Sequence, residues 1–504
     1  MGESVIIWEK PGQTENPGQF NDKLVFPMGE RYTPPCPHFR RCGGCQLQNL
    51  PYSEQLLHKQ REAVRLLGRF GPVEQIIGMD QPLHYRNKVH AAFGLDARRK
   101  PVCGIYQPGS HAIVPVERCL IEDELADEII LTIRNMLPSF KIPVYDERSG
   151  SGWLRHVLVK RGFATGQVMV VLVAATPIFK LQKPFLKQLL ERHPEISTVI
   201  LNINDRFGPV VLGKREKVLY GSGYIEDVLL GHRFRISASS FYQINPVQTE
   251  KLYAAAVDFA GLTGKETVLD AYCGIGTIGI TASDKAKQVI GVEINRDAVK
   301  DAIANARLNG IQNCWFTAGD AGQYMEQLTK DGHRPDVVFM DPPRAGCDQR
   351  FLSSLLQCAP KKIVYISCNM ETQRRDLEVL LQGGYRVKTL QPVDMFPFTN
   401  HVETVVLLSK GEIDSKKVRV EFSLEDMDMS DFQDKATYTQ IKDYVLEHSG
   451  LKVSNLYISQ IKRKCGLEVG KNYNLPKAED SRQPQCPSEK ENAIREAMKY
   501  FGMI

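Results

Sequence analysis

The chain has 504 residues, of which 42% are hydrophobic and 24% charged, and its formal net charge is +5. This length predicts two to four domains, and the composition is typical of a soluble globular protein. No apolar run is long enough to span a bilayer. The start, MGESVIIWEKPGQTENPGQF, has no basic region before an apolar core, which excludes a secretory signal. We therefore expect a cytoplasmic protein whose twelve cysteines are reduced thiols.

The first part of the chain combines a loose segment with clustered cysteines. Residues 1–35 are rich in proline and glycine and predict little order. The next stretch, CPHFRRCGGCQLQNL, carries three cysteines at C-x5-C-x2-C, namely Cys36, Cys42 and Cys45. Three clustered thiols indicate a metal site that needs one more ligand. Cys103 and Cys119 both lie in range, and spacing alone does not choose between them.

A basic helix follows the cysteines and completes a segment over residues 36–84. PYSEQLLHKQREAVRLLGRF predicts a helix capped by Ser53, with Leu56, Leu57, Val64 and Leu67 on its apolar face. Arg61, Arg65 and Arg69 are spaced by four residues and share the opposite face. Such an arm suits a phosphate-rich partner, although a solvated face is the simpler explanation of any single arginine.

The rest of the chain changes texture twice. Residues 85–245 hold short β-rich runs, among them NKVHAAFGL, HVLVKRG, QVMVVLVAA, TVILNIN and PVVLG, which predict a mostly antiparallel α+β domain. Residues 246–410 alternate apolar strands with helical patterns, which predicts an α/β domain with a doubly wound, Rossmann-like sheet. Residues 411–504 form an extension that opens acidic and continues with two helical patterns, TYTQIKDYVLEHSG and VSNLYISQIKRKCG.

A glycine-rich turn marks a cofactor site in the third part. VLDAYCGIGTIGI runs from a strand into G-x-G-x-x-G, with Gly274 and Gly276 first. This pattern lets backbone approach a ligand at a helix N-terminus, and Glu293 ends the next strand, where an acid holds ribose hydroxyls. The pattern fits both NAD and S-adenosylmethionine. Asp341, in DPP at the end of a later strand, favours a methyltransferase.

Cys368 and Glu403 suggest the reaction. Cys368 in YISCN ends the next apolar strand, where a helix N-terminus favours its thiolate. Glu403 in NHVETVV begins a later strand. A small buried cysteine and an exposed acid are the plain alternatives. Together the two suit methylation of uracil at carbon 5, because a thiolate adding to carbon 6 activates carbon 5 and a base must then remove its hydrogen. A base within RNA structure must be extruded to reach such a pocket.

Five motifs carry a resemblance that covers roughly residues 36–410. FYQIN, LDAYCGIGTIGI, MDPPRAG, YISCN and FPFTNHVE resemble the class I S-adenosylmethionine-dependent RNA (uracil-5-)-methyltransferases, most of all the 23S rRNA members. The resemblance implies that Cys368 is the nucleophile and Glu403 the base. It implies contacts to S-adenosylmethionine from Gln243, Tyr272, Glu293 and Asp341, with Thr277 and Asp320 near the adenosine.

The resemblance also chooses the fourth cysteine ligand. The rRNA members hold a [4Fe-4S] cluster with such a triplet and a later Cys-Leu or Cys-Ile, which implies Cys119; zinc is the physical alternative, because four thiolates suit either metal. A radical S-adenosylmethionine site, which wants C-x3-C-x2-C, fits less well. The chain departs from the family at Met370, where Pro is usual, and at Phe398, where many members have His. Residues 1–35 are too few for the β-barrel that many members carry.

These observations predict a monomeric enzyme that methylates carbon 5 of a uridine in 23S rRNA. The cysteine cluster favours rRNA, since bacterial tRNA members generally lack it, but a tRNA uridine-5 methyltransferase is the alternative. A non-catalytic rRNA assembly factor would not need YISCN and HVE intact. A cytosine-5 methyltransferase usually has Pro-Cys where this chain has Arg344. In the extension, Lys462, Arg463 and Lys464 suggest an RNA-binding helix, against an equally good reading as a packing appendage.

Overall fold

The computed structural model describes residues 33–410 apart from 148, 207 and 209, together with 438–465, 486–500 and 503. The expectations for most of residues 1–35 and for the acidic run 423–434 lie outside these residues. The chain divides into two compact units, Met1–Asp414 and Ser415–Ile504. Within the described residues, no helix is both long and apolar enough to cross a membrane.

A seven-stranded sheet forms the central part of the first unit, as the β-rich runs predict. Its order is β3-β2-β1-β4-β5-β6-β7, and only β5 and β6 run parallel among its pairs. Helices α3 (Glu124–Met136) and α4 (Gln182–Arg192) pack their apolar residues on it. The strands are β1 (Lys88–Leu95), β2 (Pro101–Tyr106), β3 (Ile113–Pro115), β4 (Leu154–Arg161), β5 (Val168–Ala174), β6 (Ile196–Ile203) and β7 (Arg215–Tyr220).

One expected strand of this sheet, PVVLG, is wrong. Its described residues 210–213 lie outside any strand, and β7 begins only at Arg215. Two buried asparagines explain the difference. Asn204 Nδ2 donates to the carbonyls of Val210 and Val211, at 2.6 and 2.9 Å, and Asn202 Oδ1 accepts from the Gly213 amide at 2.7 Å. Side chains thus take the backbone groups that a strand ladder would otherwise satisfy.

A second seven-stranded sheet has the predicted doubly wound form. Its order is β12-β11-β10-β13-β14-β16-β15; the first five strands are parallel, and β16 runs antiparallel to both neighbours. Separate hydrophobic clusters cover its two faces. The strands are β10 (Thr267–Ala271), β11 (Gln288–Glu293), β12 (Cys314–Ala318), β13 (Val337–Met340), β14 (Lys362–Ser367), β15 (Tyr385–Val393) and β16 (Glu403–Lys410).

Six helices accompany this sheet, and a hairpin lies between the two sheets. One cluster of buried residues runs from the central sheet through the hairpin to α5, so the two sheets share a core. The helices are α5 (Pro246–Ala260), α6 (Thr277–Ser283), α7 (Arg296–Leu308), α8 (Ala321–Lys330), α9 (Gln349–Cys358) and α10 (Met370–Gln382). The hairpin strands are β8 (Tyr224–Leu229) and β9 (His232–Ser237).

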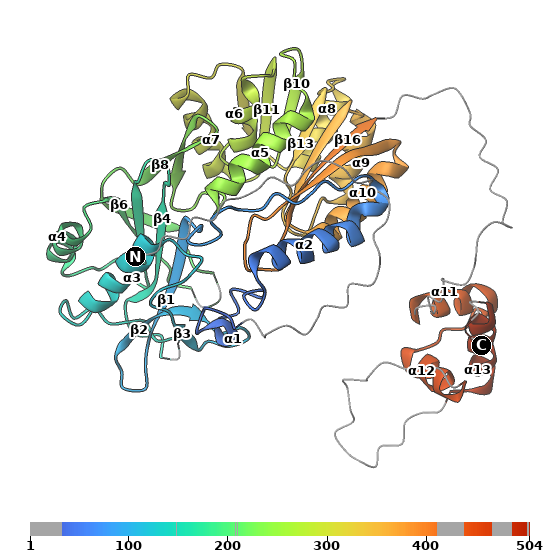
Figure 1. Cartoon of the computed structure of the whole chain (residues 1–504), viewed down its shortest axis with the longest axis horizontal. Coiled ribbons are helices and arrows are strands. Elements are labelled where there is room, and N and C mark those ends of the chain that lie inside the picture. The colour runs from blue at the N-terminus through green and yellow to red at the C-terminus, as the bar shows by residue number, and fades with distance from the viewer. Residues whose placement is uncertain are drawn as a thin grey trace, which may run out of the picture. The chain divides into compact units, whose positions relative to one another are not determined.

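The predicted basic helix is α2 (Tyr52–Leu67), and it lies alongside α10 (Figure 1). Its cap position is Pro51 rather than Ser53, and its buried face differs from the one predicted. Leu57 and Val64 are about half exposed, at 54% and 49%, whereas Gln55 and Lys59 are buried. The helix is preceded by α1 (Phe39–Cys42) and followed by the 3-10 turn η1 (Gly68–Phe70).

The second unit holds three described helices around its own core. They are α11 (Tyr438–Ser449), α12 (Asn455–Lys464) and α13 (Ser488–Tyr500); the first two match the predicted patterns and the third was not predicted. Ile441, Ile461 and Ile494 are fully buried among them. Two of the three basic residues suggested for RNA binding have other positions or partners. Lys462 is buried, and Lys464 pairs with Glu491 at 2.6 Å.

Candidate active site

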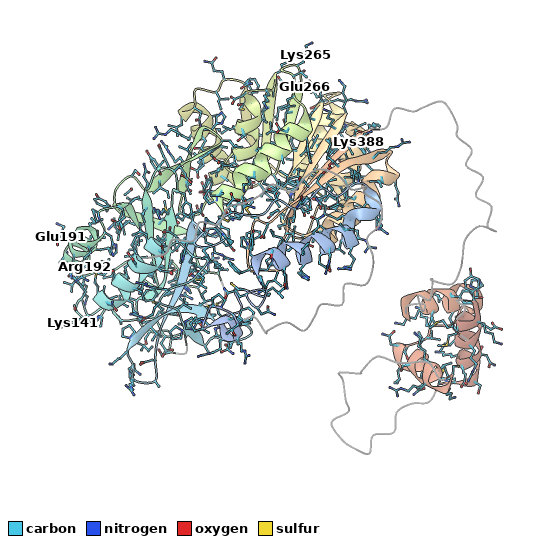
Figure 2. All side chains as sticks on the ribbon, viewed as in Figure 1. Lys141, Glu191, Arg192, Lys265, Glu266 and Lys388 are labelled. Atoms are coloured by element: carbon cyan, nitrogen blue, oxygen red, sulfur yellow. The ribbon has the colours of Figure 1, made fainter. Side chains whose placement is uncertain are left out.

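The expected site residues gather at the carboxyl edge of the second sheet. Parallel strands end at the same edge, and ligands of such sheets bind there. Lys265 and Glu266, labelled in Figure 2, mark the opposite edge, where β10 begins. The site is therefore made by the segments that follow β10, β11, β13 and β14 and by the start of antiparallel β16.

The glycine loop after β10 has the backbone that its sequence predicts. Tyr272, Gly274 and Gly276 all have positive φ, at 72°, 56° and 85°. A Cβ built on Gly276 would lie 3.0 Å from the Phe316 ring, so both conformation and space favour glycine there. Glu293, at the end of β11, accepts from the Gly274 amide at 3.1 Å. The structure thus joins the loop to the acid predicted to accompany it.

Asp270 supports this loop and was missed at the sequence level. It lies within β10, is fully buried, and accepts from the Gly279 amide in α6 at 2.8 Å through Oδ2. Its other oxygen, Oδ1, is buried without a partner, and burial raises the pKa of Asp270 to about 8. The available signal was an acid inside the apolar run VLDAY, since buried acids need a specific partner.

Tyr253 of α5 brings three of the expected cofactor residues together. Its hydroxyl accepts from Thr277 Oγ1 at 3.4 Å. Burial and the charge of Asp341 raise the pKa of Tyr253, while hydrogen bonds with Thr277 and Gln243 lower it. Gln243, Thr277 and Asp341 therefore all act on one phenol, although they come from segments far apart in the sequence.

Tyr272 and Asp320 also lie near this edge, with structural contacts of their own. The Tyr272 ring packs against Phe351, with ring centroids 5.3 Å apart. Asp320 caps α8 by accepting from the Gln323 amide at 2.9 Å, and the preceding Gly319 amide bonds to the Glu293 carbonyl. The helix cap is a sufficient structural role for the Asp320 carboxylate. Its position beside Glu293 still places it near the candidate cofactor site.

Strand pairing places Cys368 and Glu403 opposite each other. Ser367, the last residue of β14, pairs with Thr404 of β16. Because the two strands are antiparallel, the residue after Ser367 and the residue before Thr404 meet at the strand ends. Glu403 is 4% exposed, and its charge acts on the Cys368 thiol. A thiol and a buried carboxylate are thus neighbours, as the proposed chemistry requires.

A cavity of about 410 Å³ opens in front of the thiol. One wall is the turn from Cys368 into α10, and another is the loop before Glu403. The third wall comes from α2 and was not expected from the sequence. The residues of α2 that line the cavity are His58, Glu62, Arg65 and Leu66. Its volume is in the range that accommodates a small organic group such as a nucleobase.

Burial controls the charges around this cavity. It raises the pKa of Asp341 to about 7, and burial together with the charge of Asp341 raises that of Glu403 to about 8. Burial also raises the pKa of the Cys368 thiol, and the charges of Glu403 and Asp341 raise it further. The thiol is therefore harder to ionise in the free protein than its position before α10 suggests, and a nearby cation would favour its thiolate.

Arg344 is the cation that the structure places at this point. Its guanidinium lowers the pKa of both Cys368 and Glu403 and lies 3.1–3.2 Å from the ring nitrogens of His401. Burial and Arg344 lower the pKa of His401, which keeps the ring neutral as a hydrogen-bond acceptor. The Arg344 carbonyl accepts from Asn369 and Thr372 at the start of α10. Arg344 thus connects the three segments that carry the reacting groups.

The cysteine-rich segment lies close to this site. Cys45 and Cys119 pack against the same small apolar cluster, which contains Phe398. Cys103, the competing ligand, is fully buried and belongs to the core of the central sheet. Burial raises the pKa of Cys45 to about 11, and the charges of Cys42 and Cys36 contribute to the shift. Over the described residues, however, no group of three or more His, Cys, Asp or Glu side chains is arranged to hold a metal ion.

Comparison with known proteins places these features in a family. Residues 209–411 match the family model described as tRNA (Uracil-5-)-methyltransferase. An RNA methyltransferase of Clostridium acetobutylicum is 45% identical over 394 residues, which are 77% of this chain and 85% of that protein. One from Caldanaerobacter subterraneus is 42% identical over 413 residues, 81% of this chain and 91% of that protein.

A solved structure shares the arrangement. The tRNA (uracil-54, C5)-methyltransferase of Pyrococcus abyssi, in complex with S-adenosyl-L-homocysteine, superposes with a TM-score of 0.61 and 27% identity. The match covers 73% of this chain and 86% of that one. Similarity of sequence and of fold therefore agree on the same class of protein.

Proposed function

Because this chain belongs to the RNA (uracil-5-)-methyltransferase family, we propose that it methylates carbon 5 of a specific uridine in 23S rRNA. The observation that carries the proposal is the pairing of Cys368, which lines the cavity, with the buried Glu403 on the adjacent strand. Neither group alone explains the site, whereas together they meet the two demands of this reaction.

The reaction proceeds by covalent catalysis at Cys368. Its thiolate adds to carbon 6 of the uracil, and the carbon 5–carbon 6 π electrons become an enolate. Carbon 5 then takes the methyl group, and the bond between that methyl and the donor sulfur breaks. Glu403 finally accepts the proton from carbon 5, the double bond re-forms, and the carbon 6–sulfur bond breaks to release the thiolate. Arg344 favours the ionised state of both groups.

S-adenosylmethionine supplies the methyl group, by analogy with the solved relative, which contains S-adenosyl-L-homocysteine. We place it at the carboxyl edge of the second sheet. Its proposed contacts are Gln243, Tyr272, Gly274, Gly276, Thr277, Glu293, Asp320 and Asp341. The open backbone of the glycine loop, with Glu293 beside it, supports this placement. Asp341 and Glu403, both anionic when ionised, would also favour a sulfonium nearby.

The choice of 23S rRNA rests on the cysteines. We propose that Cys36, Cys42, Cys45 and Cys119 hold a [4Fe-4S] cluster, with zinc as the alternative. The donor chemistry fits, because these are soft thiols in one region. Burial raises the pKa of Cys42 and Cys45, and the charge of the partly buried Arg86 opposes that shift. Binding of the metal would require the four cysteine side chains to move closer together. A monomer acting in the cytoplasm, where thiols stay reduced, completes the proposal.

A tRNA uridine is the second candidate, and the solved relative, a tRNA methyltransferase, favours it. Mass spectrometry of rRNA and tRNA fragments, from cells with and without the gene, decides between the two. Loss of 5-methyluridine from 23S rRNA alone is the expected result. Loss from tRNA alone would replace the rRNA proposal.

The chemistry is tested by two substitutions. Cys368→Ala should abolish methylation of RNA from the deletion strain while the protein still binds S-adenosylmethionine. Glu403→Gln should trap a covalent protein–RNA adduct that survives a denaturing gel, because addition proceeds and elimination does not. Methylation by Cys368→Ala, or no adduct with Glu403→Gln, would refute the mechanism.

A further inference from the structure

We propose that helix α2 and the segment before it position Glu403, with Gln55 as the key positioning residue. The connection runs through the stretch 394–402, here called the base loop, which joins β15 to Glu403 at the start of β16. This inference rests on the proposed function, since it assigns a role in the elimination step. It concerns residues that lie more than 300 positions apart in the sequence.

The peptide of Phe398 is held on both sides. Phe398 has φ of +68°, a left-handed conformation that is strained for a bulky residue. Its amide donates to Gln55 Oε1 at 3.0 Å. Its carbonyl accepts from the amides of Gln46 and Leu47, both at 2.9 Å. Three hydrogen bonds from the cysteine-rich segment and α2 thus maintain a conformation that the base loop would not keep alone.

The rest of the base loop is held from the same side. Lys59 Nζ lies 2.5 Å from Asp394 Oδ1 and donates to the Phe396 carbonyl at 3.0 Å. Tyr52 donates its hydroxyl to Asp394 Oδ2 at 2.7 Å. Lys59 and Asp394 are almost fully buried, so their charges have no water to replace these partners. This is why the buried face of α2 includes Gln55 and Lys59, beside the apolar Ala63, Leu66 and Leu67, where the sequence predicts an apolar surface throughout.

The held peptide is linked to the base through a short chain of contacts. Thr399 Oγ1 donates to the Phe396 carbonyl at 2.8 Å and accepts from the His401 amide at 3.2 Å. Glu403 follows two residues later and pairs with Val393, the residue before the base loop. The loop therefore begins and ends at one strand pair, and its internal conformation positions the Glu403 carboxylate relative to Cys368.

This arrangement predicts an effect on one chemical step. Addition of Cys368 to carbon 6 does not require Glu403, but removal of the carbon 5 proton does. A misplaced Glu403 therefore slows release of the methylated product more than it slows formation of the adduct. Loss of stability, by contrast, would lower both steps together.

The test compares Gln55→Leu with the matched control Gln60→Leu. Gln60 lies on the same helix and also bonds backbone, donating to the Glu74 carbonyl at 3.1 Å and accepting from the Ile76 amide at 2.7 Å, but it does not bond the base loop. Single-turnover reactions with RNA from the deletion strain measure adduct formation and adduct decay. We expect decay to slow about tenfold in Gln55→Leu and to remain near the wild-type rate in Gln60→Leu.

Gln55→Glu is the partial rescue variant. Gln55 is fully buried and also donates Nε2 to the Leu50 carbonyl at 2.8 Å, so only a protonated carboxyl can make that bond while accepting from the Phe398 amide. Its decay rate should therefore lie between those of Gln55→Leu and wild type. The inference is overturned if Gln55→Leu and Gln60→Leu behave alike, or if Gln55→Leu slows formation and decay equally. Failure of the proposed function would show differently, as a wild-type protein that forms no 5-methyluridine in any RNA.

Discussion

At the scale of single residues, the site contains ionisable groups whose pKa values burial raises. Asp341, Glu403 and Cys368 all have raised pKa values for this reason, and Arg344 opposes the shift at the latter two. Before the methyl transfer, a sulfonium would stabilise the thiolate. After the proposed transfer, the donor is uncharged, and in this mechanism Glu403 would act as a base with Arg344 as its neighbouring cation.

The pH dependence of adduct decay follows from Glu403. Its raised pKa of about 8 means that the carboxyl is mostly protonated, and inactive as a base, below that pH. The decay rate should therefore rise with pH, about tenfold per unit below pH 8, and level off above it. Rapid-quench measurements with preformed adduct give the profile.

Arg344→Gln supplies the check on this profile. Removing the guanidinium takes away an interaction that lowers the pKa of Glu403, so the midpoint should move to higher pH. Arg350→Gln is the control, because Arg350 pairs with Glu326 on the exposed surface. A midpoint that stays fixed or falls in Arg344→Gln would contradict the assignment of the titration to Glu403.

At the scale of elements, the structure gives the N-terminal segment a second possible task. Besides carrying three cysteines, it holds the base loop through the amides of Gln46 and Leu47, directly after Cys45. Phe398 packs with Cys45 and Cys119 in one apolar cluster. A metal bound there would lie beside the loop that leads to Glu403.

The proposed cluster makes a clear analytical prediction. Protein purified without oxygen should contain iron and acid-labile sulfide in equal amounts, and Cys45→Ala should lose both. Cys103→Ala is the control, because this thiol lies in the core of the central sheet and should leave the iron content unchanged. If the protein contains zinc instead of iron, the four proposed cysteine ligands stand and the metal assignment changes to zinc. Iron that survives Cys45→Ala would refute the site.

At the scale of the whole molecule, the chain joins a two-sheet unit to a small helical unit. In the first unit the two sheets share a hydrophobic cluster, whereas the second unit has a core of its own. Of the three basic residues suggested for RNA contact, Lys462 is buried and Lys464 pairs with Glu491. Two of the three basic side chains of α12 are therefore engaged within the second unit rather than presented to RNA.

Removal of residues 415–504 tests this assignment. A plot of log affinity for rRNA against log salt has a negative slope. We expect the size of that slope to decrease by less than about one after the removal, whereas loss of three phosphate contacts to single-stranded RNA would decrease it by about two. Filter binding over a range of salt concentrations measures it. A loss of two or more would show that the second unit is a major RNA-binding surface.

Much of this protein is readable from local sequence. The β-rich runs, the alternating βα pattern and the glycine loop indicate both sheets, because strand and helix periodicities are local properties. The strand-end positions of Cys368 and Asp341 place them at one edge, since parallel strands share their direction. The wrong strand at 210–213 arose because two buried asparagines bond the backbone of a nearby loop, 6 to 11 residues further along the chain. The wrong face of α2 arose because Lys59 and Gln55 take ionic or backbone partners from a segment more than 300 residues away.

The sequence by itself indicated the α/β fold class and the family resemblance, and it predicted Cys368 and Glu403 as the reacting pair. Only the tertiary structure showed that β14 and β16 bring that pair face to face, that Arg344 interacts with both and with His401, and that α2 forms one wall of the cavity. The reason is physical. Hydrophobic periodicity depends on residues that are close together in the sequence, so it can be recognised without the tertiary structure. The hydrogen bonds of Gln55 and Lys59 to the base loop form only when segments more than 300 residues apart pack together.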